Sequence, residues 1–203
     1  MTAAPPFDDR LVSPSPSSSA EVGYWGMSLF VATEATMFAM LIASYVFLGT
    51  ANPAWPPAGI ARPSLVLPPI MTGVLLASSG TMYWAERGIR EGKRRRLCIG
   101  LATTILLGLV FLGIQAAEYR EKLRTMRPEV HAYAAAFYTI TSFHALHVMT
   151  GLLFLSYALA RGLLGHFDAE HHLAVKNVAL YWHFVDVVWL AILTTLYISP
   201  RLY

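Results

Sequence analysis

The sequence is poor in charge and in cysteine. Charged residues make up 13% of the 203 residues and hydrophobic residues 56%, whereas soluble domains carry roughly 25% charged residues. A chain this apolar requires lipid as its solvent, which excludes an ordinary soluble domain. Cys98 is the only cysteine, so an internal disulfide and a cysteine-rich metal site are excluded as well. The net charge of +3 comes mostly from short basic clusters between apolar runs, a pattern that indicates membrane-helix ends rather than nucleic-acid binding.

The N-terminal segment lacks the features of a cleavable signal peptide. It carries Asp8, Asp9 and a Pro/Ser tract at 14–19, a composition typical of disordered tails. The apolar run that follows is longer than the roughly 7–15 residues of a signal h-region, so we expect it to stay as a membrane anchor. The sequence therefore predicts a disordered cytoplasmic tail over 1–22 and a transmembrane domain over 23–203.

Five apolar stretches are long enough to cross a bilayer, which requires roughly 20 apolar helical residues. The stretches are continuous and do not alternate, so they predict helices rather than the strands of a barrel. The expected fold is an all-α integral membrane protein, a bundle of five transmembrane helices. The predicted helices are about 24–48, 66–86, 97–117, 132–160 and 173–198.

Lysine and arginine are distributed unequally between the two ends of this bundle. The end with the N-terminal tail and the second and fourth connections holds nine of the fifteen, and six of those lie in the dense run 87–96. Because cytoplasmic loops carry the excess of positive charge, we expect a cytoplasmic N-terminus and an external C-terminus.

Small residues on two of the predicted helices predict close helix packing in lipid. They are Gly73 and Ala77, and the ridge Gly100, Thr104 and Gly108.

Glu34 is an acidic residue at membrane depth, where ionisable groups are costly and are functional candidates. It is about ten residues into the first predicted helix, roughly 15 Å at 1.5 Å per residue. No base on its own helix can pair with it, so desolvation favours the neutral acid. Two interpretations stay open: a carboxyl that exchanges protons or contacts lipid, and a protonated carboxyl hydrogen-bonded to a neighbouring helix.

Histidines recur in the last two predicted helices. His144 and His147 stand three residues apart, as do His183 and Asp186. Three buried histidines and a carboxylate could hold a metal or a haem, and Asp186 could instead orient a ligating histidine. The alternative is an interhelical hydrogen-bond network that fixes these two helices together. We favour the network, because a bis-histidine haem site needs room for a porphyrin and nothing in the sequence shows that room.

Polar residues near the ends of the predicted helices have simpler explanations. Glu118 ends the third helix, where we expect it to be solvated or paired with Arg120 or Lys122. Three more histidines lie in the polar fourth connection without accompanying cysteines, so solvated loop histidines are expected there rather than a metal site. These are His166, His171 and His172.

Four stretches, taken together, resemble subunit III of the haem–copper cytochrome c and quinol oxidases. They are similar in turn to the family patterns G-x-x-x-F-[I/V]-x-[S/T]-E-x-x-[F/M]-F, Q-x-x-E-[Y/W], F-Y-x-[L/I]-T-x-F-H-x-x-H-V-x-x-G and Y-W-H-F-V-D-x-V-W. They occur in family order on four of the predicted helices, and the resemblance covers about 24–200. The four stretches are 25–38, 115–119, 137–151 and 181–189.

The resemblance implies the five-helix form of the family, which lacks the two N-terminal helices of seven-helix members. In those members, the two helices and the rest of the bundle form a V-shaped cleft that holds phospholipid. Here the pair is either supplied by the large subunit of the oxidase or absent. The family's subunit III binds neither haem nor copper. We therefore expect no cofactor in this chain apart from phospholipid, with haem and copper in the partner subunits.

The implied function is that of a non-redox subunit of a proton-pumping aerobic terminal oxidase in a prokaryotic plasma membrane. Subunit I is the expected main partner, whose stability and proton uptake this chain supports; subunits II and IV and membrane lipids are further partners, and nucleic acid is not. No catalytic residue and no metal ligand are expected. The candidates for proton, lipid or subunit I contacts are Glu34, Glu118, His144, His147, His183 and Asp186.

Three other functions are alternatives to the oxidase. The first is an accessory membrane subunit of a nitric oxide reductase system, whose first helix tends to lack the glutamate found here at Glu34. The second is a membrane cytochrome with its own haem on the buried histidines. The third is a free-standing proton-coupled transporter, for which the sequence shows no inverted repeat and no broken helix.

Overall fold

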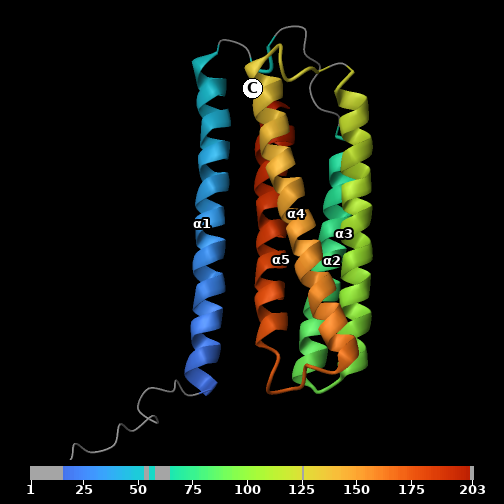
Figure 1. Cartoon of the computed structure of the whole chain (residues 1–203). Helices are drawn as coiled ribbons and strands as arrows, with labels where there is room; N and C mark the ends of the chain where they lie inside the picture. The colour runs from blue at the N-terminus through green and yellow to red at the C-terminus, as the bar shows by residue number, and fades with distance from the viewer. Residues whose placement is uncertain (1–15, 53–54, 58–64, 125, 202–203) are drawn as a thin grey trace, which may run out of the picture.

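The chain folds into a bundle of five long helices that run up and down in succession (Figure 1). This computed structural model describes residues 16–52, 55–57, 65–124 and 126–201, and no strand occurs in those ranges. The predicted all-α bundle is therefore confirmed. The helices are α1 Pro16–Ala51, α2 Leu67–Arg90, α3 Arg94–Lys122, α4 Ala132–Leu164 and α5 Leu173–Ile192.

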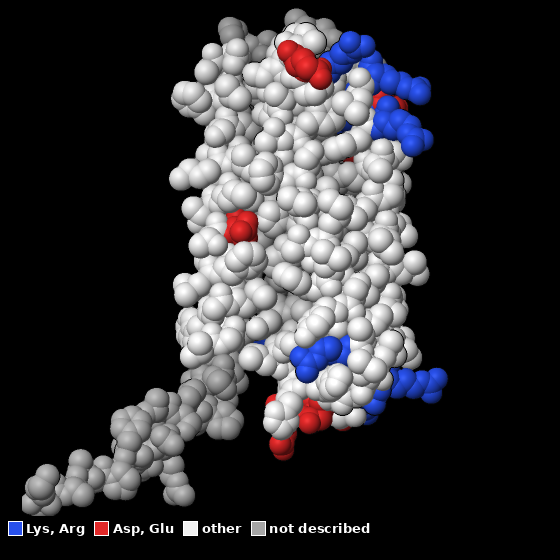
Figure 2. Space-filling model, in the orientation of Figure 1, with Lys and Arg blue, Asp and Glu red and all other residues white. Residues whose placement is uncertain are grey.

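Four helical segments are long and apolar enough to cross a membrane: α1 from Val22 onward, α3, α4, and α5 with its extension to Arg201. The other predicted span, α2, has 24 residues and is not among these four segments. It runs beside α3 along the bundle and also packs on α5 (Figure 1). Most charged side chains on this face gather at the two ends of the molecule, and the broad band between them is uncharged apart from an acidic patch near its middle (Figure 2), as expected for a membrane protein, in which charge at membrane depth is rare.

The first helix begins earlier than expected. It starts at Pro16, whereas the sequence predicted a tail over 1–22 and a helix from about 24. Proline suits a helix start because the N–H that it lacks would have no helical partner there. Residues 16–22 are therefore helical rather than part of a disordered tail. Residues 1–15, the rest of the predicted tail, lie outside the described residues.

The turn between α2 and α3 is much shorter than the predicted connection. Only Glu91, Gly92 and Lys93 separate the two helices, and Gly92 adopts a left-handed φ of 69°, which glycine tolerates best. Side-chain hydrogen bonds from Lys93 and Arg87 lower the pKa of the Glu91 carboxyl. Most of the basic residues predicted for this loop therefore belong to the ends of the two helices.

The fourth helix is sealed at its end by a side chain from the third. Helix α4 runs to Leu164, past the predicted end at 160, and stops at Gly165 with φ 84°, the left-handed conformation common at helix C-termini. The Arg94 guanidinium donates to the Gly162 carbonyl at 2.6 Å and also to the Leu163 carbonyl. Backbone oxygens that have no partner within α4 are thus satisfied from α3.

The last helix changes its hydrogen-bond pattern near the C-terminus. Beyond α5, residues Leu193–Ile198 form a π-helical segment, η2, and Ser199–Arg201 a short 3-10 turn, η3. The sequence had predicted one uninterrupted helix to about 198. Segments of π-helix are rare and often accompany functional sites.

Small residues bring α3 close to its neighbours, as predicted. A Cβ atom on Gly100 would lie 2.6 Å from the Cβ of Ala85 on α2. A Cβ atom on Gly108 would lie 2.8 Å from Leu152 and 2.9 Å from the ring of Trp182. Gly73 on α2 differs, because a Cβ there would meet nothing within 4 Å. The predicted packing surface on α2 is therefore not used within the described part of the chain.

Candidate functional site: polar side chains at membrane depth

Glu34 of α1 and His147 of α4 form a polar contact about halfway along both helices. The Glu34 Oε2 atom lies 3.0 Å from His147 Nε2, and His147 Nδ1 lies 2.7 Å from the Phe143 carbonyl. A carbonyl only accepts hydrogen bonds, so Nδ1 carries a proton. Nε2 and Oε2 then share one further proton, either as an ion pair or as a neutral pair. The sequence placed Glu34 at this depth but could not identify its partner.

Aromatic side chains hold this pair in position. The ring of Phe38, one helical turn after Glu34, meets His147 edge-on with ring centroids 4.9 Å apart. From α5, the Tyr181 hydroxyl donates to the backbone carbonyl of His147 at 3.3 Å. Both side chains of the pair remain partly exposed on the outside of the bundle. The shared proton therefore lies at the edge of the bundle rather than in its core.

His144 is the most enclosed of the histidines at membrane depth. It is fully buried, and its ring lies 5.3 Å from Trp189 and 5.7 Å from Phe111, measured between centroids. Neither ring nitrogen has a hydrogen-bond partner among the described residues. Burial among aromatic rings favours the neutral imidazole. His144 therefore contributes packing between α3, α4 and α5.

His183 and Asp186 of α5 lie beside Ser79 of α2. The Ser79 hydroxyl is 2.7 Å from His183 Nδ1, and a carboxyl oxygen of Asp186 is 3.9 Å from the same nitrogen. The predicted network between α4 and α5 is therefore wrong in its partners. The α5 histidine bonds to α2, and His147 of α4 bonds to α1. Side chains three residues apart on a helix share a broad face but point toward different neighbours.

Glu118 is buried, not solvated. Lys122 Nζ lies 2.6 Å from its Oε1 atom, and the Tyr197 hydroxyl is 3.3 Å from each carboxylate oxygen. The ammonium group also lies over the rings of Phe137 and Tyr197, at 4.3 and 4.7 Å from their centroids. Of the predicted partners, Lys122 is the observed one, and Arg120 is exposed. This cluster attaches the π-helical segment to α3.

The loop histidines lie in a separate polar turn between α4 and α5. The Asp168 carboxylate accepts hydrogen bonds from the backbone N–H groups of Glu170 and His171, at 2.8 and 2.6 Å. The bonds from His171, backbone first and then ring, lower the pKa of Asp168. Within the described ranges, no group of three His, Cys, Asp or Glu side chains is arranged to hold a metal ion.

Hydroxyl groups of α2 form a second set of interhelical contacts, which the sequence analysis missed. Ser78 Oγ accepts from Trp182 Nε1 at 3.0 Å, and Thr72 Oγ1 accepts from Trp189 Nε1 at 3.0 Å. On the other side of α2, Thr81 bonds to a hydroxyl of α3 at 2.7 Å. The available signal was the repeated occurrence of Ser and Thr within one apolar helix.

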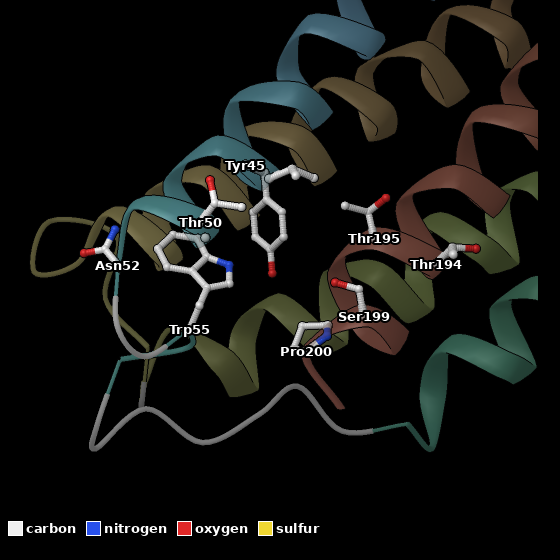
Figure 3. Close-up of a pocket in the computed structure, with 10 residues that line it drawn as sticks. Tyr45, Thr50, Asn52, Trp55, Thr194, Thr195, Ser199 and Pro200 are labelled. Carbon is white, nitrogen blue, oxygen red and sulfur yellow. The ribbon is translucent and has the colours of Figure 1, made fainter. Parts of the chain in front are cut away.

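A cavity of about 490 Å³ opens at the C-terminal end of α1, between that helix and η2. Trp55 and Tyr45 project from one side of it, opposite Thr195 and Ser199 (Figure 3). The rings of Tyr45 and Trp55 meet edge-on, with centroids 5.4 Å apart. No Lys, Arg, Asp or Glu occurs among its described lining residues. The cavity is therefore an uncharged space with polar and aromatic walls.

Comparisons with known proteins identify the family of this chain. The family model for cytochrome c oxidase subunit III matches residues 18–200. The chain belongs to the cytochrome c oxidase subunit III family. Cytochrome c oxidase subunit 3 of Cyprinus carpio is 40% identical over 179 residues, which are 85% of this chain and 68% of the relative. The proteins of the same name from Pongo abelii and Drosophila yakuba are 39% identical over the same shares of each chain.

Family membership gives the membrane-depth residues their context. Subunits III of cytochrome c oxidase are non-redox membrane subunits of a respiratory complex. In this subunit III, Glu34, His147 and His183 are each engaged by a side chain of another helix. Neither the nitric oxide reductase alternative nor the haem-binding alternative finds support in these comparisons.

Proposed function

We propose that this chain supports subunit I of a proton-pumping aerobic terminal oxidase that reduces dioxygen to water. Its role is to keep the catalytic core stable and supplied with protons during turnover, while haem and copper reside in partner subunits. Subunits II and IV and phospholipids complete its surroundings. Family membership over most of the chain supports this proposal.

The Glu34–His147 pair is the observation that carries the proton-uptake part of this proposal. The two groups share one proton across a 3.0 Å contact about halfway along α1 and α4. Both are partly exposed on the outer surface of the chain, so a neighbouring subunit can exchange protons with them. A carboxyl–imidazole pair can hold or release a proton with little movement of either helix.

Glu34→Gln tests this role in the assembled oxidase. Glutamine keeps a hydrogen bond to the imidazole but cannot exchange a proton, so we expect normal assembly with slower proton uptake or fewer turnovers before inactivation. The matched control is Glu129→Gln, which changes an exposed carboxyl outside the membrane helices. If Glu34→Gln prevents assembly altogether, the residue acts as a structural contact. If it assembles and behaves like the control, the proton-uptake role is wrong.

Purification of the tagged chain from aerobically grown cells tests the proposed complex. We expect it to retain a core subunit with haem and copper, together with phospholipid. Recovery with a nitric oxide reductase and without a copper-containing oxidase would remove the proposal. A stoichiometric Soret band from the isolated chain would overturn its non-redox character.

The proposed location is a prokaryotic plasma membrane, with the N-terminus in the cytoplasm. The basic end of the bundle, formed by the α2–α3 turn and the α4–α5 loop, supports this orientation. The variant Glu91→Cys, in a Cys98→Ser background, is expected to react with membrane-impermeant reagents only in inside-out vesicles. Labelling from the outside of intact cells would show that the chain has the opposite orientation.

A further inference from the structure

The three histidines at membrane depth differ in how their ring nitrogens are satisfied. Both nitrogens of His147 have partners, and His144 is enclosed by aromatic rings. His183 is bonded through Nδ1 to Ser79, while its Nε2 atom has no partner among the described residues. The side chain of His183 is 37% exposed. One nitrogen of this ring therefore faces away from the bundle.

The exposed nitrogen lies deep in the predicted hydrocarbon layer. His183 is about ten residues into α5, so it lies roughly 15 Å along a helix that crosses a layer about 30 Å thick. In one tautomer Nε2 has a hydrogen to donate, and in the other it has a lone pair to accept. Lipid acyl chains satisfy neither, and leaving such a group unpaired in hydrocarbon is costly.

Asp186 adds a buried polar group on the inner side of His183. Its side chain is 7% exposed, and one carboxyl oxygen lies 3.9 Å from His183 Nδ1. Neither carboxyl oxygen has a hydrogen-bond partner of normal geometry among the described residues. The imidazole thus stands between a buried carboxyl group and the outside of the chain. Polar clusters of this kind in membrane helices generally face protein rather than lipid.

The surroundings of His183 leave room for another helix. One turn along α5, the side chain of Val187 is 64% exposed, and the strip continues at Leu190. This strip has α2 on one side, through Ser79, and α1 on the other, where Phe38 packs near Phe184.

The adjoining surface of α2 is open as well. Gly80 follows Ser79 directly, and a Cβ on Gly80 or on Gly73 would meet nothing within 4 Å. Ala77, which lies between them in the chain, is exposed. Small residues on an open helix face allow the close approach of a second helix in lipid.

We propose that His183, Val187 and Leu190, with Gly73 and Gly80 of α2 beside them, form the docking surface for a transmembrane helix of another oxidase subunit. That helix places a hydrogen-bonding side chain against His183 Nε2. The inference rests on the proposed function, because it requires a multisubunit complex. It goes further by naming the face of the chain and the chemistry of the contact.

Photocrosslinking in the intact complex tests the docking surface. A benzophenone amino acid at Val187 is expected to form an adduct with a membrane-spanning peptide of a core subunit. The same probe at Leu153, exposed on α4, measures background labelling, and we expect Val187 to give at least about fivefold more protein adduct than this reference. Adducts of Val187 with lipid alone, or protein yields equal to those of Leu153, would overturn the proposal.

Substitutions of His183 test the hydrogen bond. Glutamine can still donate and accept, whereas phenylalanine can do neither. We expect His183→Phe to increase dissociation of the chain from the complex in detergent about 3- to 10-fold, with His183→Gln close to the parent protein. Equal retention of the two variants would exclude a hydrogen bond at this atom, provided that both accumulate normally in membranes.

The outcomes also separate this inference from the function on which it rests. If no oxidase core is recovered with the tagged chain, the proposed function fails. If the core is recovered and Val187 contacts only lipid, the function stands and the docking surface is wrong.

Discussion

Glu34 and His147, separated by 113 positions in the chain, meet at 3.0 Å and connect α1 to α4. Apart from this pair, α1 is held at membrane depth mainly by apolar and aromatic contacts such as that of Phe38. The pair combines two properties, a proton shared between two helices and partial exposure at the surface of the chain. Substitutions of Glu34 or His147 can therefore change the packing of α1 without the same change in proton exchange, and the two effects are measured separately.

Removal of one partner of the pair is expected to loosen α1. His147→Leu leaves Glu34 without a hydrogen-bond partner and should cost about 1–3 kcal/mol of stability. The double variant Glu34→Leu/His147→Leu should recover much of this loss, because no unpaired polar group remains. Thermal unfolding of the purified complex, with protease sensitivity of α1 as a second measure, reports both effects. A double variant whose loss equals the sum of the losses of His147→Leu and Glu34→Leu would show that the pair is not coupled.

Two glycines of α3 offer a matched test of helix packing. Gly100→Ala would bring a methyl group to 2.6 Å from the Ala85 Cβ atom, whereas a Cβ at Gly113 meets nothing within 4 Å. We expect Gly100→Ala to destabilise the subunit by about 1–3 kcal/mol through overpacking. Gly113→Ala should be neutral or slightly stabilising, since alanine favours helix by up to ~1 kcal/mol. Detergent-titrated unfolding compares the two directly, and similar midpoints would refute the packing of α2 against α3.

The stability of the subunit should depend strongly on Lys122, which pairs with the buried carboxylate of Glu118. Lys122→Met removes the ammonium at 2.6 Å and is expected to cost about 3–5 kcal/mol, the penalty for breaking a buried ion pair. Arg120→Met on the exposed side of α3 should change stability by less than about 0.5 kcal/mol. Adding Glu118→Gln to Lys122→Met should restore most of the loss. Melting temperatures of the four proteins decide the matter, and an unrescued double variant would contradict it.

The Asp168 turn is expected to open at acidic pH. The hydrogen bonds from His171 lower the pKa of Asp168 in the folded turn relative to the unfolded chain. For a carboxyl group with a lowered pKa, the stabilisation is complete above the unfolded pKa and is lost as the pH falls through the folded value. Hydrogen exchange of the Glu170 and His171 amides, corrected for intrinsic rates, should show protection near neutral pH that begins to fall below about pH 4, the ordinary pKa range of an Asp carboxyl, and disappears at lower pH. Asp168→Ala should lack this protection at every pH.

Much of the bundle could be predicted because membrane helices follow local rules. Continuous apolar runs determine where a helix can cross lipid, and the ridge of Gly100 and Gly108 marked a close contact before any partner was known. The same reasoning placed Glu34 at its depth. It could not supply His147, because a sequence shows which face a residue occupies but not which distant helix lies opposite.

The remaining differences arise where tertiary contacts decide between local alternatives. The π-helical pattern of η2 coincides with the contact of Tyr197 with Glu118, which lies 79 residues away in the chain. The sequence around 193–198 carries no sign of that partner. In the same way, the burial of Glu118 depends on Lys122 and on the aromatic rings above it, so a residue expected at a solvated helix end lies inside the protein.

The contact of Arg94 with the end of α4 links topology to folding. The arginines at the start of α3 carry positive charge that helps to orient the chain in the membrane, yet the guanidinium of Arg94 also donates hydrogen bonds to the Gly162 and Leu163 carbonyls. Neutralising it would fray a helix terminus as well as remove a charge. Arg95, its exposed neighbour, carries the same charge but is not one of the side chains that bond to the end of α4. Charge-swap studies of membrane insertion should therefore begin at Arg95, where a change of membrane orientation can be measured without loss of the hydrogen bonds at the end of α4.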